Sequence, residues 1–375
     1  MALRQEEGWH ATHREHFGHD RWEDLRNALE RDHEHMCYVN PFLPEGEKDV
    51  IREDYNLTAT CIPGAYDFAL PAIERQFPIA DASDQRHLFV DRIREERHEL
   101  ELRAPGEELA PFALSEGSTL VVAAALQVEE GDNVLDACAN GITSLILAGG
   151  IFQRCLRAQA LPLDLQGRLV CNEVVKSKAS RLQQTMHSLL PWRLFDTNAS
   201  VAGHGPRVVF KSVDLATTSN AAERLGPYDK ILLGPPCTDD KAMLRGSSPG
   251  GLSKWSPAIA KVNAERQLKW LHNSLWLLRE GGIVLYFTRA LSAEEGDGVI
   301  ERLFQRVQGL FDLEVMPLEE LVAGFVPGLS AEPTDWGARI MPDKTSCGPM
   351  FFTRLRLLRR RHQGHEQAAG FITLG

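Results

Sequence analysis

The first strongly patterned stretch of the chain predicts a helix that starts near Asp20. In DRWEDLRNALERDHEHM, side chains that suit a buried stripe recur at helical spacing: Trp22, Leu25, Leu29, His33 and Met36. Glu23 lies three residues after Asp20, which suits an N-terminal cap at Asp20. Residues 41–82 contain five prolines and little periodicity, so we expect an extended strap with short turns there.

Residues 84–103 are densely charged and fit either a helix or the last arm of an N-terminal extension. The segment APGEELAPF then marks a boundary near residue 105. We therefore expect an extension over 1–105, a main domain over 106–361 and a C-terminal tail over 362–375.

From Thr119 onward, helical and strand-like runs alternate. LVVAAALQVEEGDNVLDACANG predicts a buried helix, a turn and a short strand over 134–138. Further strands are predicted at 168–173, 207–214, 230–235 and 283–288, separated by helices at 143–157, 176–190 and 257–279. Strands spaced by helices need crossover connections, so the pattern predicts an α/β protein with a doubly wound parallel sheet that is buried on both faces.

Two more strand candidates, FDLEVMPLEEL and GPMFFTRLRLLRR, follow near the C-terminus without an amphipathic helical pattern between them. Such a pair suits an antiparallel edge on a parallel sheet. That combination is typical of the Rossmann-like class I methyltransferase fold. Enzymes with this fold use S-adenosylmethionine as the methyl donor. A fold by itself does not fix function, however.

Composition adds limits to this picture. No apolar run reaches the ~18 to 20 residues that cross a bilayer, so we expect no membrane partner. The seven cysteines form no CxxC pair, which indicates free thiols in a reducing compartment and no metal site. The net charge of −11 resides almost wholly in residues 1–105, which hold 13 Lys and Arg against 23 Asp and Glu. The acidic third is either a solvated face or a surface for a basic partner.

Candidate chemistry collects where the predicted strands end, because ligands of open α/β sheets bind outside the carboxyl ends of the strands. Asp136, Glu173 and Asp214 end three successive strands, and GPPCT ends a fourth. Carboxylates in these places can accept hydrogen bonds from ribose hydroxyls and an adenine amino group, which predicts an adenosine cofactor. Taken singly, each acid also fits a helix cap or a solvated loop.

Cys237 of GPPCT has two readings. A lone cysteine is usually a small core residue. A thiolate directly after a strand and a Pro-Pro pair is also able to add to C6 of a pyrimidine, provided that its neighbours lower its pKa. The sequence leaves both open.

The order of these motifs resembles the Sun-domain family of RNA cytosine-5 methyltransferases, the RsmB/Nop/Sun group, over about residues 108–358. Within the family, the likeness is greatest to the mitochondrial ribosomal-RNA member. Shared features are the segments ASRLQQTMHSLLP, PCTDD and GPMFFTRLRLL, and an N-terminal pattern made of Phe17, Gly18, Trp22, Arg26, Leu29, Asn40 and Phe42.

The resemblance implies a cofactor site that is partly preserved. The family loop DxCAAPGGKT corresponds to DACANGITSL, in which Asp136, Cys138 and Ala139 persist while the Pro-Gly-Gly-Lys segment is lost; Gly141 is a further candidate cofactor contact. By resemblance, Glu173 takes the ribose-binding position and Asp214 the adenine-binding position. We expect weakened binding of S-adenosylmethionine, since glycines let a backbone approach a ligand closely.

The catalytic half departs further from the family pattern. The family's DxPC aspartate, which holds the target base, corresponds to Gly234, and the cysteine that assists product release corresponds to Cys237. The nucleophile of the YSTCSL motif corresponds to Arg289, and a guanidinium cannot attack carbon. These differences indicate a protein without catalytic activity.

The resemblance then implies a factor for mitochondrial ribosome assembly in the mitochondrial matrix, with ribosomal RNA and a helical-repeat protein of the mTERF type as partners. A predicted RNA-binding strip consists of Arg354, Arg356, Arg359, Arg360 and Arg361, although a solvated strand end is the alternative. An active methyltransferase that uses Cys237 is a second hypothesis, and a small-molecule methyltransferase of the same fold is a third.

Overall fold

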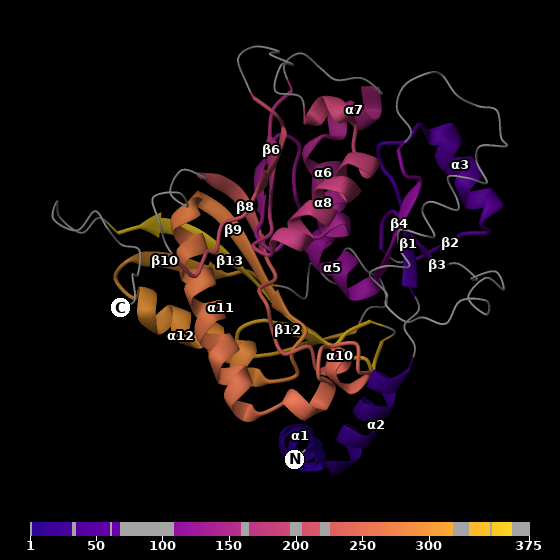
Figure 1. Cartoon of the computed structure of the whole chain (residues 1–375). Helices are drawn as coiled ribbons and strands as arrows, with labels where there is room; N and C mark the ends of the chain where they lie inside the picture. The colour runs from indigo at the N-terminus through magenta and orange to yellow at the C-terminus, as the bar shows by residue number, and fades with distance from the viewer. Residues whose placement is uncertain are drawn as a thin grey trace.

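A large mixed sheet forms the centre of the molecule (Figure 1). The computed structural model describes residues 2–31, 35–60, 62–67, 109–158, 165–195, 205–217, 226–317, 330–345 and 347–361. Five neighbouring strands run parallel in the order β7-β6-β5-β8-β9. Their bounds are β5 (Asn133–Asp136), β6 (Arg168–Asn172), β7 (Val208–Lys211), β8 (Tyr228–Leu233) and β9 (Leu278–Thr288). The predicted parallel sheet is confirmed, and β9 begins five residues earlier than predicted.

The other side of this sheet is antiparallel. The long strand β13 (Met350–Arg360) pairs antiparallel with β9 and also with β10 (Phe311–Val315). This confirms the edge that the two C-terminal apolar runs predicted. Two short strands that were not predicted, β11 (Ala331–Pro333) and β12 (Ala338–Ile340), extend the sheet beyond β13.

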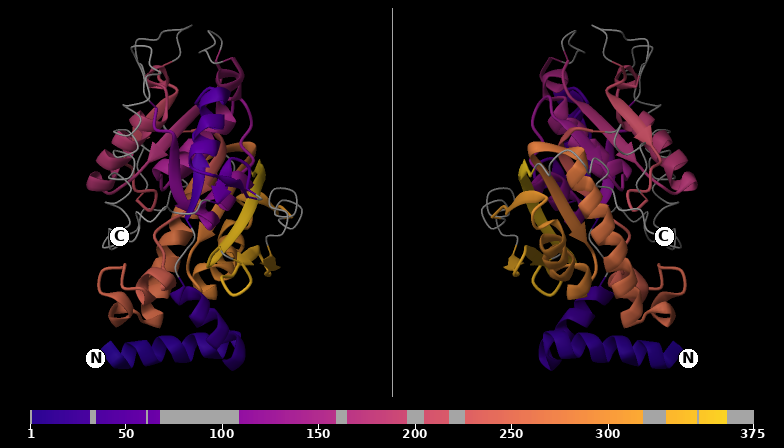
Figure 2. Two further views of the ribbon diagram at one scale, coloured as in Figure 1. Left: turned by 90° about the vertical axis from the view of Figure 1, so that its right-hand side faces the viewer. Right: turned by 90° about the vertical axis from the view of Figure 1, so that its left-hand side faces the viewer.

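Helices cover both faces of the sheet (Figures 1 and 2). One face carries α5 (Gly117–Ala125), α6 (Gly141–Ile151), α7 (Gln153–Ala158) and α8 (Lys176–Leu189), and the other carries α11 (Pro257–Leu277) and α12 (Asp297–Val307). Consecutive strand residues alternate between the two cores: Val134 packs in the first, Leu135 in the second. The helix predicted over 143–157 is in fact two helices that break at Phe152.

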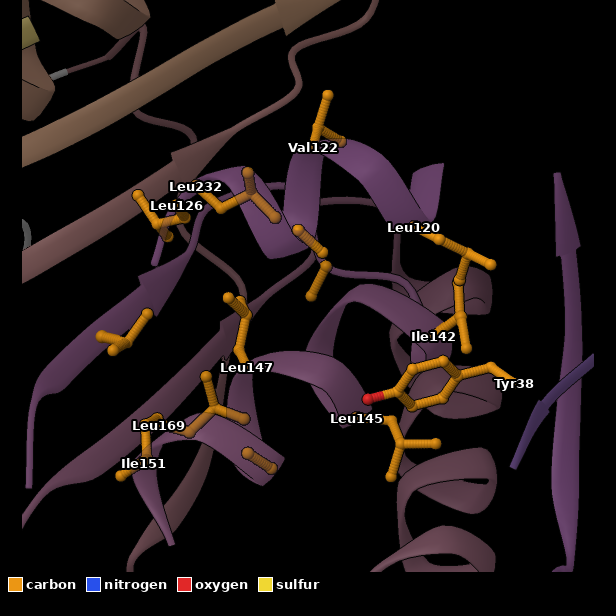
Figure 3. Close-up of a cluster of buried hydrophobic side chains, with 14 of the residues drawn as sticks. Tyr38, Leu120, Val122, Leu126, Ile142, Leu145, Leu147, Ile151, Leu169 and Leu232 are labelled. Carbon is orange, nitrogen blue, oxygen red and sulfur yellow. The ribbon is translucent and has the colours of Figure 1, made fainter. Parts of the chain in front are cut away.

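A second, smaller sheet packs beside α5 and α6. It has the order β2-β3-β1-β4, with β1 (His35–Val39), β2 (Thr58–Ala59), β3 (Ala65–Asp67) and β4 (Phe112–Glu116). Figure 3 shows Tyr38 of β1 beside Ile142 and Leu145 of α6. The prediction of an extended strap over 41–82 is wrong for the described residues of that segment, because α3 (Glu45–Asp54) and two strands form there. The helix α3 begins directly after Pro44, and the acidic residues of its first turn favour a helix start.

The chain begins with a helical hairpin that lies across one end of the molecule (Figure 2). It consists of α1 (Ala2–Phe17) and α2 (His19–Glu30), joined at Gly18, whose φ of 81° favours glycine. Trp22 and Leu25 are buried as predicted. The predicted cap at Asp20 is wrong, because Gly18 precedes the first turn, and Met36 lies in β1 rather than on the helical stripe.

The segment 84–103, the boundary near residue 105 and the tail 362–375 lie outside the described residues. Among the residues that are described, no helix has both the length and the apolar character to span a bilayer. In the same ranges, no three His, Cys, Asp or Glu side chains gather as a metal site would require.

Candidate functional site

A cavity of about 840 Å³ opens where the parallel strands end. Its walls come from the loop between β5 and α6, the segment from Glu173 into α8, the loop after β8 and the last residues of β9. The predicted site residues that line it are Ala139, Gly141, Glu173, Gly234, Cys237 and Arg289. Asp136 and Asp214 do not line it. The sheet thus brings together six of the eight candidate cofactor and catalytic positions.

Asp136 is buried below the cavity and fastens α6 to the end of β5. Its carboxylate accepts hydrogen bonds from the hydroxyls of Thr143 (2.7 Å) and Ser144 (2.8 Å). Burial raises the pKa of Asp136 to about 6. Asn140 caps the same helix, since its side chain accepts the backbone N–H of Thr143. Asp136 therefore positions the first turn of α6, which forms one wall.

Gly141 is explained by the packing of two helices. A Cβ at this position would stand 2.5 Å from Cγ2 of Thr185 on α8. The absence of a side chain lets α6 and α8 approach closely, so Gly141 shapes the cavity wall through packing.

The acids after β6 and β7 differ in where they point. Glu173 lines the cavity and accepts the backbone N–H of Val175 at 2.7 Å. Asp214 instead accepts a hydrogen bond from the guanidinium of Arg266 at 3.1 Å. Arg266 lines the cavity and Asp214 does not, so the carboxylate of Asp214 is paired with a cation of the cavity wall.

Asn172 is a residue whose importance the sequence analysis missed. Its amide donates to the carbonyl oxygens of Ala137 and Val213, both at 3.0 Å, and accepts the N–H of Val213 at 2.8 Å. Asn172 is buried, so it joins the ends of three strands without water. Its place in an otherwise apolar strand was the available signal.

Cys237 and Arg289 lie side by side on the wall of the far part of the cavity. The backbone N–H of Arg289 donates to Sγ of Cys237 at 3.4 Å. The Arg289 guanidinium binds the carboxylate of Asp239 at 2.9 Å and lies 3.9 Å from that of Glu116. Burial raises the pKa of the Cys237 thiol to about 12, although the charge of Arg289 acts in the opposite direction. The thiol is consequently protonated at neutral pH.

The ring of Phe287 occupies the space beside Gly234. A Cβ at position 234 would lie 2.6 Å from Cε1 of that ring, closer than real Cβ atoms come. Any side chain at position 234 therefore requires Phe287 to move.

A buried polar network supports the loop that carries Cys237. The carboxylate of Glu295 accepts the N–H of Thr238 at 2.9 Å and the amide of Gln267 at 2.7 Å, and burial raises its pKa. The Tyr286 hydroxyl donates to the carbonyl oxygen of Glu295. The sequence analysis did not find this network, since its members come from β9, η4 (Ala293–Glu295) and α11.

Asp240, two residues after Thr238, anchors the N-terminal hairpin to the same loop. It accepts hydrogen bonds from the indole of Trp9 at 2.8 Å and the backbone N–H of Leu291 at 2.8 Å, and His13 lies 3.2 Å away. Trp9 and Trp22 pack with Trp255, close to α10 (Asp240–Leu244) and η3 (Gly251–Lys254). The hairpin is thus part of the structure around the site.

The predicted arginine strip on β13 is mostly engaged within the protein. The predicted RNA contact by Arg354 is wrong, because this residue is only 1% exposed and its guanidinium donates to the amide oxygen of Gln127. Arg356 pairs with Glu314, whereas Arg359 and Arg361 both pair with Asp312. Arg360 donates to the carbonyl oxygens of Trp276 and Leu278. RNA contact by the last four arginines stays a prediction.

Comparison with solved structures identifies the fold. A methyltransferase homolog protein from Pyrococcus horikoshii superposes with a TM-score of 0.59 at 19% identity, covering 91% of this chain and 92% of that one. NSun6 from Pyrococcus horikoshii, solved with SFG, gives a TM-score of 0.62 at 16% identity, covering 94% and 98%. The class I methyltransferase fold is confirmed.

The family follows from the sequence. The protein-family model described as 16S rRNA methyltransferase RsmB/F matches residues 123–356, which is more than half of the chain. This chain therefore belongs to that family. The predicted membership of the Sun-domain group is confirmed.

Two related proteins illustrate how similar this chain is to RNA methyltransferases in sequence. The mitochondrial tRNA (cytosine(34)-C(5))-methyltransferase of Mus musculus is 24% identical over 284 residues, which is 73% of this chain and 70% of that protein. The 5-cytosine rRNA methyltransferase NSUN4 of Bos taurus is 26% identical over 255 residues, or 66% of this chain. The alignment spans 60% of the length of NSUN4.

Proposed function

We propose that this protein is a non-catalytic member of the RNA cytosine-5 methyltransferases that binds RNA and assists assembly of the mitochondrial ribosome. The observation that carries the proposal is the ion pair of Arg289 with Asp239 at the position of the family's nucleophile. A guanidinium keeps its proton at neutral pH and has no lone pair for attack on C6 of cytosine. Loss of a catalytic nucleophile typically costs a factor of ~10⁴ to 10⁶ in rate.

The surroundings of Arg289 support the same conclusion. The Phe287 ring fills the space in which an aspartate at position 234 would hold the base. Cys237, the thiol that lines this part of the cavity, has a pKa raised to about 12 by burial. Neither group offers an anchor or a thiolate to a pyrimidine.

The near part of the cavity fits S-adenosylmethionine. The volume of the whole cavity, about 840 Å³, lies within the usual range of ligand pockets, ~300 to 1,000 Å³. Glu173 would accept the ribose hydroxyls, and the backbone of Ala139 and Gly141 would line the methionine portion. When bound, the cofactor supplies an electrophilic methyl group. Because Asp214 is paired with Arg266, adenine finds no free carboxylate at that position, and we expect weak binding.

Partners and compartment extend the proposal. The relatives from mouse and Danio rerio are named as mitochondrial proteins, and NSUN4 is named as an rRNA methyltransferase, which supports the mitochondrial matrix and ribosomal RNA for this chain. The acidic charge of residues 1–105 suits a basic protein, and a helical-repeat partner of the mTERF type fits that requirement.

The test combines binding with turnover. S-adenosylmethionine is titrated into the purified protein by calorimetry, and transfer of labelled methyl groups to small-subunit ribosomal RNA is then measured. We expect no incorporation above background, and RNA that remains bound to the protein. Methyl transfer by the parent that Cys237→Ala abolishes would overturn the proposal.

The second candidate function, methyl transfer with Cys237 as the nucleophile, is favoured by the position of this thiol on the cavity wall. Its requirement is a thiolate, which the raised pKa opposes. The Cys237→Ala comparison separates the two functions directly.

A further inference from the structure

The segment that contains α8, beside the cavity, carries charge of one sign only. Between Val174 and Phe195 the chain contains no Asp or Glu, although the whole protein carries a net charge of −11. The same segment contains Lys176, Lys178 and Arg193 as well as Arg181. A cationic stretch in an acidic protein indicates a surface for an anionic partner.

The cations of α8 are available for such a partner. Lys176, Lys178 and Arg181 are exposed, and none of them forms an ion pair with any residue that the structure describes. Lys178 and Arg181 also line the cavity. On β13, by contrast, Arg356 and Arg359 are already paired with carboxylates.

Apolar side chains mark both ends of this helix. Val175 is 49% exposed just before α8, and Trp192 is 53% exposed just after it. The guanidinium of Arg193 lies 6.0 Å from the centre of the Trp192 ring. With 14 residues, α8 is about 20 Å long, so the cations in its first half and the exposed Trp192 beyond its end lie within about one helix length of each other.

We infer that Lys176, Lys178, Arg181 and Trp192 form a binding surface for single-stranded RNA that leads to the mouth of the cavity. Phosphates contact the three cations, and one unstacked base packs on the indole. Duplex RNA presents no free base face to an aromatic ring, so the tryptophan selects an unpaired segment. The inference rests on the proposed RNA-binding function and names the surface that performs it.

The experiment measures fluorescence anisotropy of a labelled single strand of about 12 nucleotides, bound by the full-length protein at several salt concentrations near 0.1 M. The combined variant Lys176→Ala, Lys178→Ala and Arg181→Ala is compared with the control Lys48→Ala, Arg157→Ala and Arg279→Ala. The three control cations pair with Glu45, Glu130 and Asp229, and none of them lines the cavity. Both sets remove three cations. Thermal unfolding of each variant verifies that it is folded.

We expect the α8 variant to bind at least about tenfold more weakly, with a salt slope smaller by about 2, since each phosphate contact contributes about 0.7 for single strands. Trp192→Ala should weaken binding by about 5- to 100-fold while the salt slope stays unchanged, because stacking releases no counterions. The control variant should stay within about twofold of the parent, because its cations are neutralised by acids in place.

The possible outcomes separate a failure of this binding surface from a failure of the proposed RNA-binding function. If the parent binds RNA and the α8 variant binds it equally well, this surface is wrong while the proposed function stands. If the parent does not bind RNA, the proposed function and this surface fall together. If polyglutamate displaces the RNA as well as unlabelled RNA does and Trp192→Ala has no effect, the surface serves an acidic protein and the inference is overturned.

Discussion

The two halves of the cavity differ in what their residues do for the rest of the fold. Near β5 and β6, Asp136 and Asn172 hold strand ends and the first turn of α6, and the same elements place Ala139 and Glu173 on the wall. Near β8 and β9, Gly234 meets the Phe287 ring and Arg289 pairs with Asp239, which is partly exposed. Asp136 and Asn172 thus hold the fold of the first half together, whereas Gly234 and Arg289 of the second half hold no strand ends together.

This difference bears on the proposed loss of catalysis. Removing the Asn172 side chain leaves two carbonyl oxygens and one N–H without their partner, so the fold resists a change there. The side chain of Arg289 is partly exposed and pairs with Asp239, so the sheet depends less on which side chain stands at position 289. Stability therefore constrains Asn172 more than it constrains position 289.

The largest effect we expect is in the reactivity of Cys237. At about pH 8, native Cys237 should react with iodoacetamide more than about a hundredfold more slowly than it does in the unfolded chain, because burial raises its pKa to about 12 and only the thiolate reacts. A time course read by peptide mass spectrometry measures both rates. Equal rates would mean that the far half of the cavity holds a reactive thiol, which would contradict the proposal that this half lacks a nucleophile.

Asn172→Ala should destabilise the near half and the whole domain by about 3 kcal/mol, since two carbonyl oxygens and one N–H lose their buried partner. Urea denaturation measures the free energy of unfolding. Ser212→Ala is the matched control, because its hydroxyl also bonds a carbonyl oxygen after a strand but is exposed, and it should change stability by less than about 0.5 kcal/mol. Equal losses in the two variants would contradict the role of Asn172.

Asp136 gives the near half a dependence on pH. Unfolded Asp136 loses its proton near pH 4, whereas in the folded protein burial raises its pKa to about 6. Its contribution to stability is fully present below about pH 4 and is lost as pH rises through 6, by up to about 3 kcal/mol.

Asp136→Asn removes this dependence. The stability of the parent relative to the variant should therefore fall as pH rises from about 4 to 6. Urea unfolding curves at several pH values in this window provide the measurement. A difference that is constant or that increases with pH would show that the carboxylate is already charged when buried.

Gly234→Ala should cost about 1 to 3 kcal/mol, because the new Cβ meets the Phe287 ring. Combining it with Phe287→Ala should recover part of that loss, and a double-mutant cycle in urea measures the coupling. Gly46→Ala is the control: its Cβ meets nothing within 4 Å in α3, so alanine should stabilise the helix slightly. Additive effects of the two substitutions would mean that the ring does not restrict position 234.

The sequence predicted the parts of the fold that depend on local periodicity. Strands β5, β6 and β8 and helices α8 and α11 appear within a few residues of their predicted places, because each carries its own apolar pattern. The small sheet was not predicted, since β1 and β4 pair across a separation that no local pattern reveals. The α1 helix was also missed, because its buried residues, such as Trp9, pack against distant segments.

The sequence predicted that most of the candidate residues meet at one cavity, but not how their side chains are oriented; which of them bind or react stays a prediction. Strand ends correctly indicated that Glu173 and Cys237 share a cavity. The turn of Asp214 toward Arg266 depends on a side chain 52 residues away, and the burial of Arg354 depends on Gln127 at a separation of 227. Such contacts between distant residues decide which charges remain free, and they follow from the tertiary structure.

The bond between Trp9 and Asp240 has a consequence for synthesis of the protein. The two residues are 231 positions apart, so at ~5 to 20 residues per second a ribosome needs roughly 10 to 50 seconds to make the second after the first. Throughout that interval, the indoles of Trp9 and Trp22 lack the docking site that later covers them. The nascent chain therefore carries two uncovered indoles long before the surface that buries them has been made.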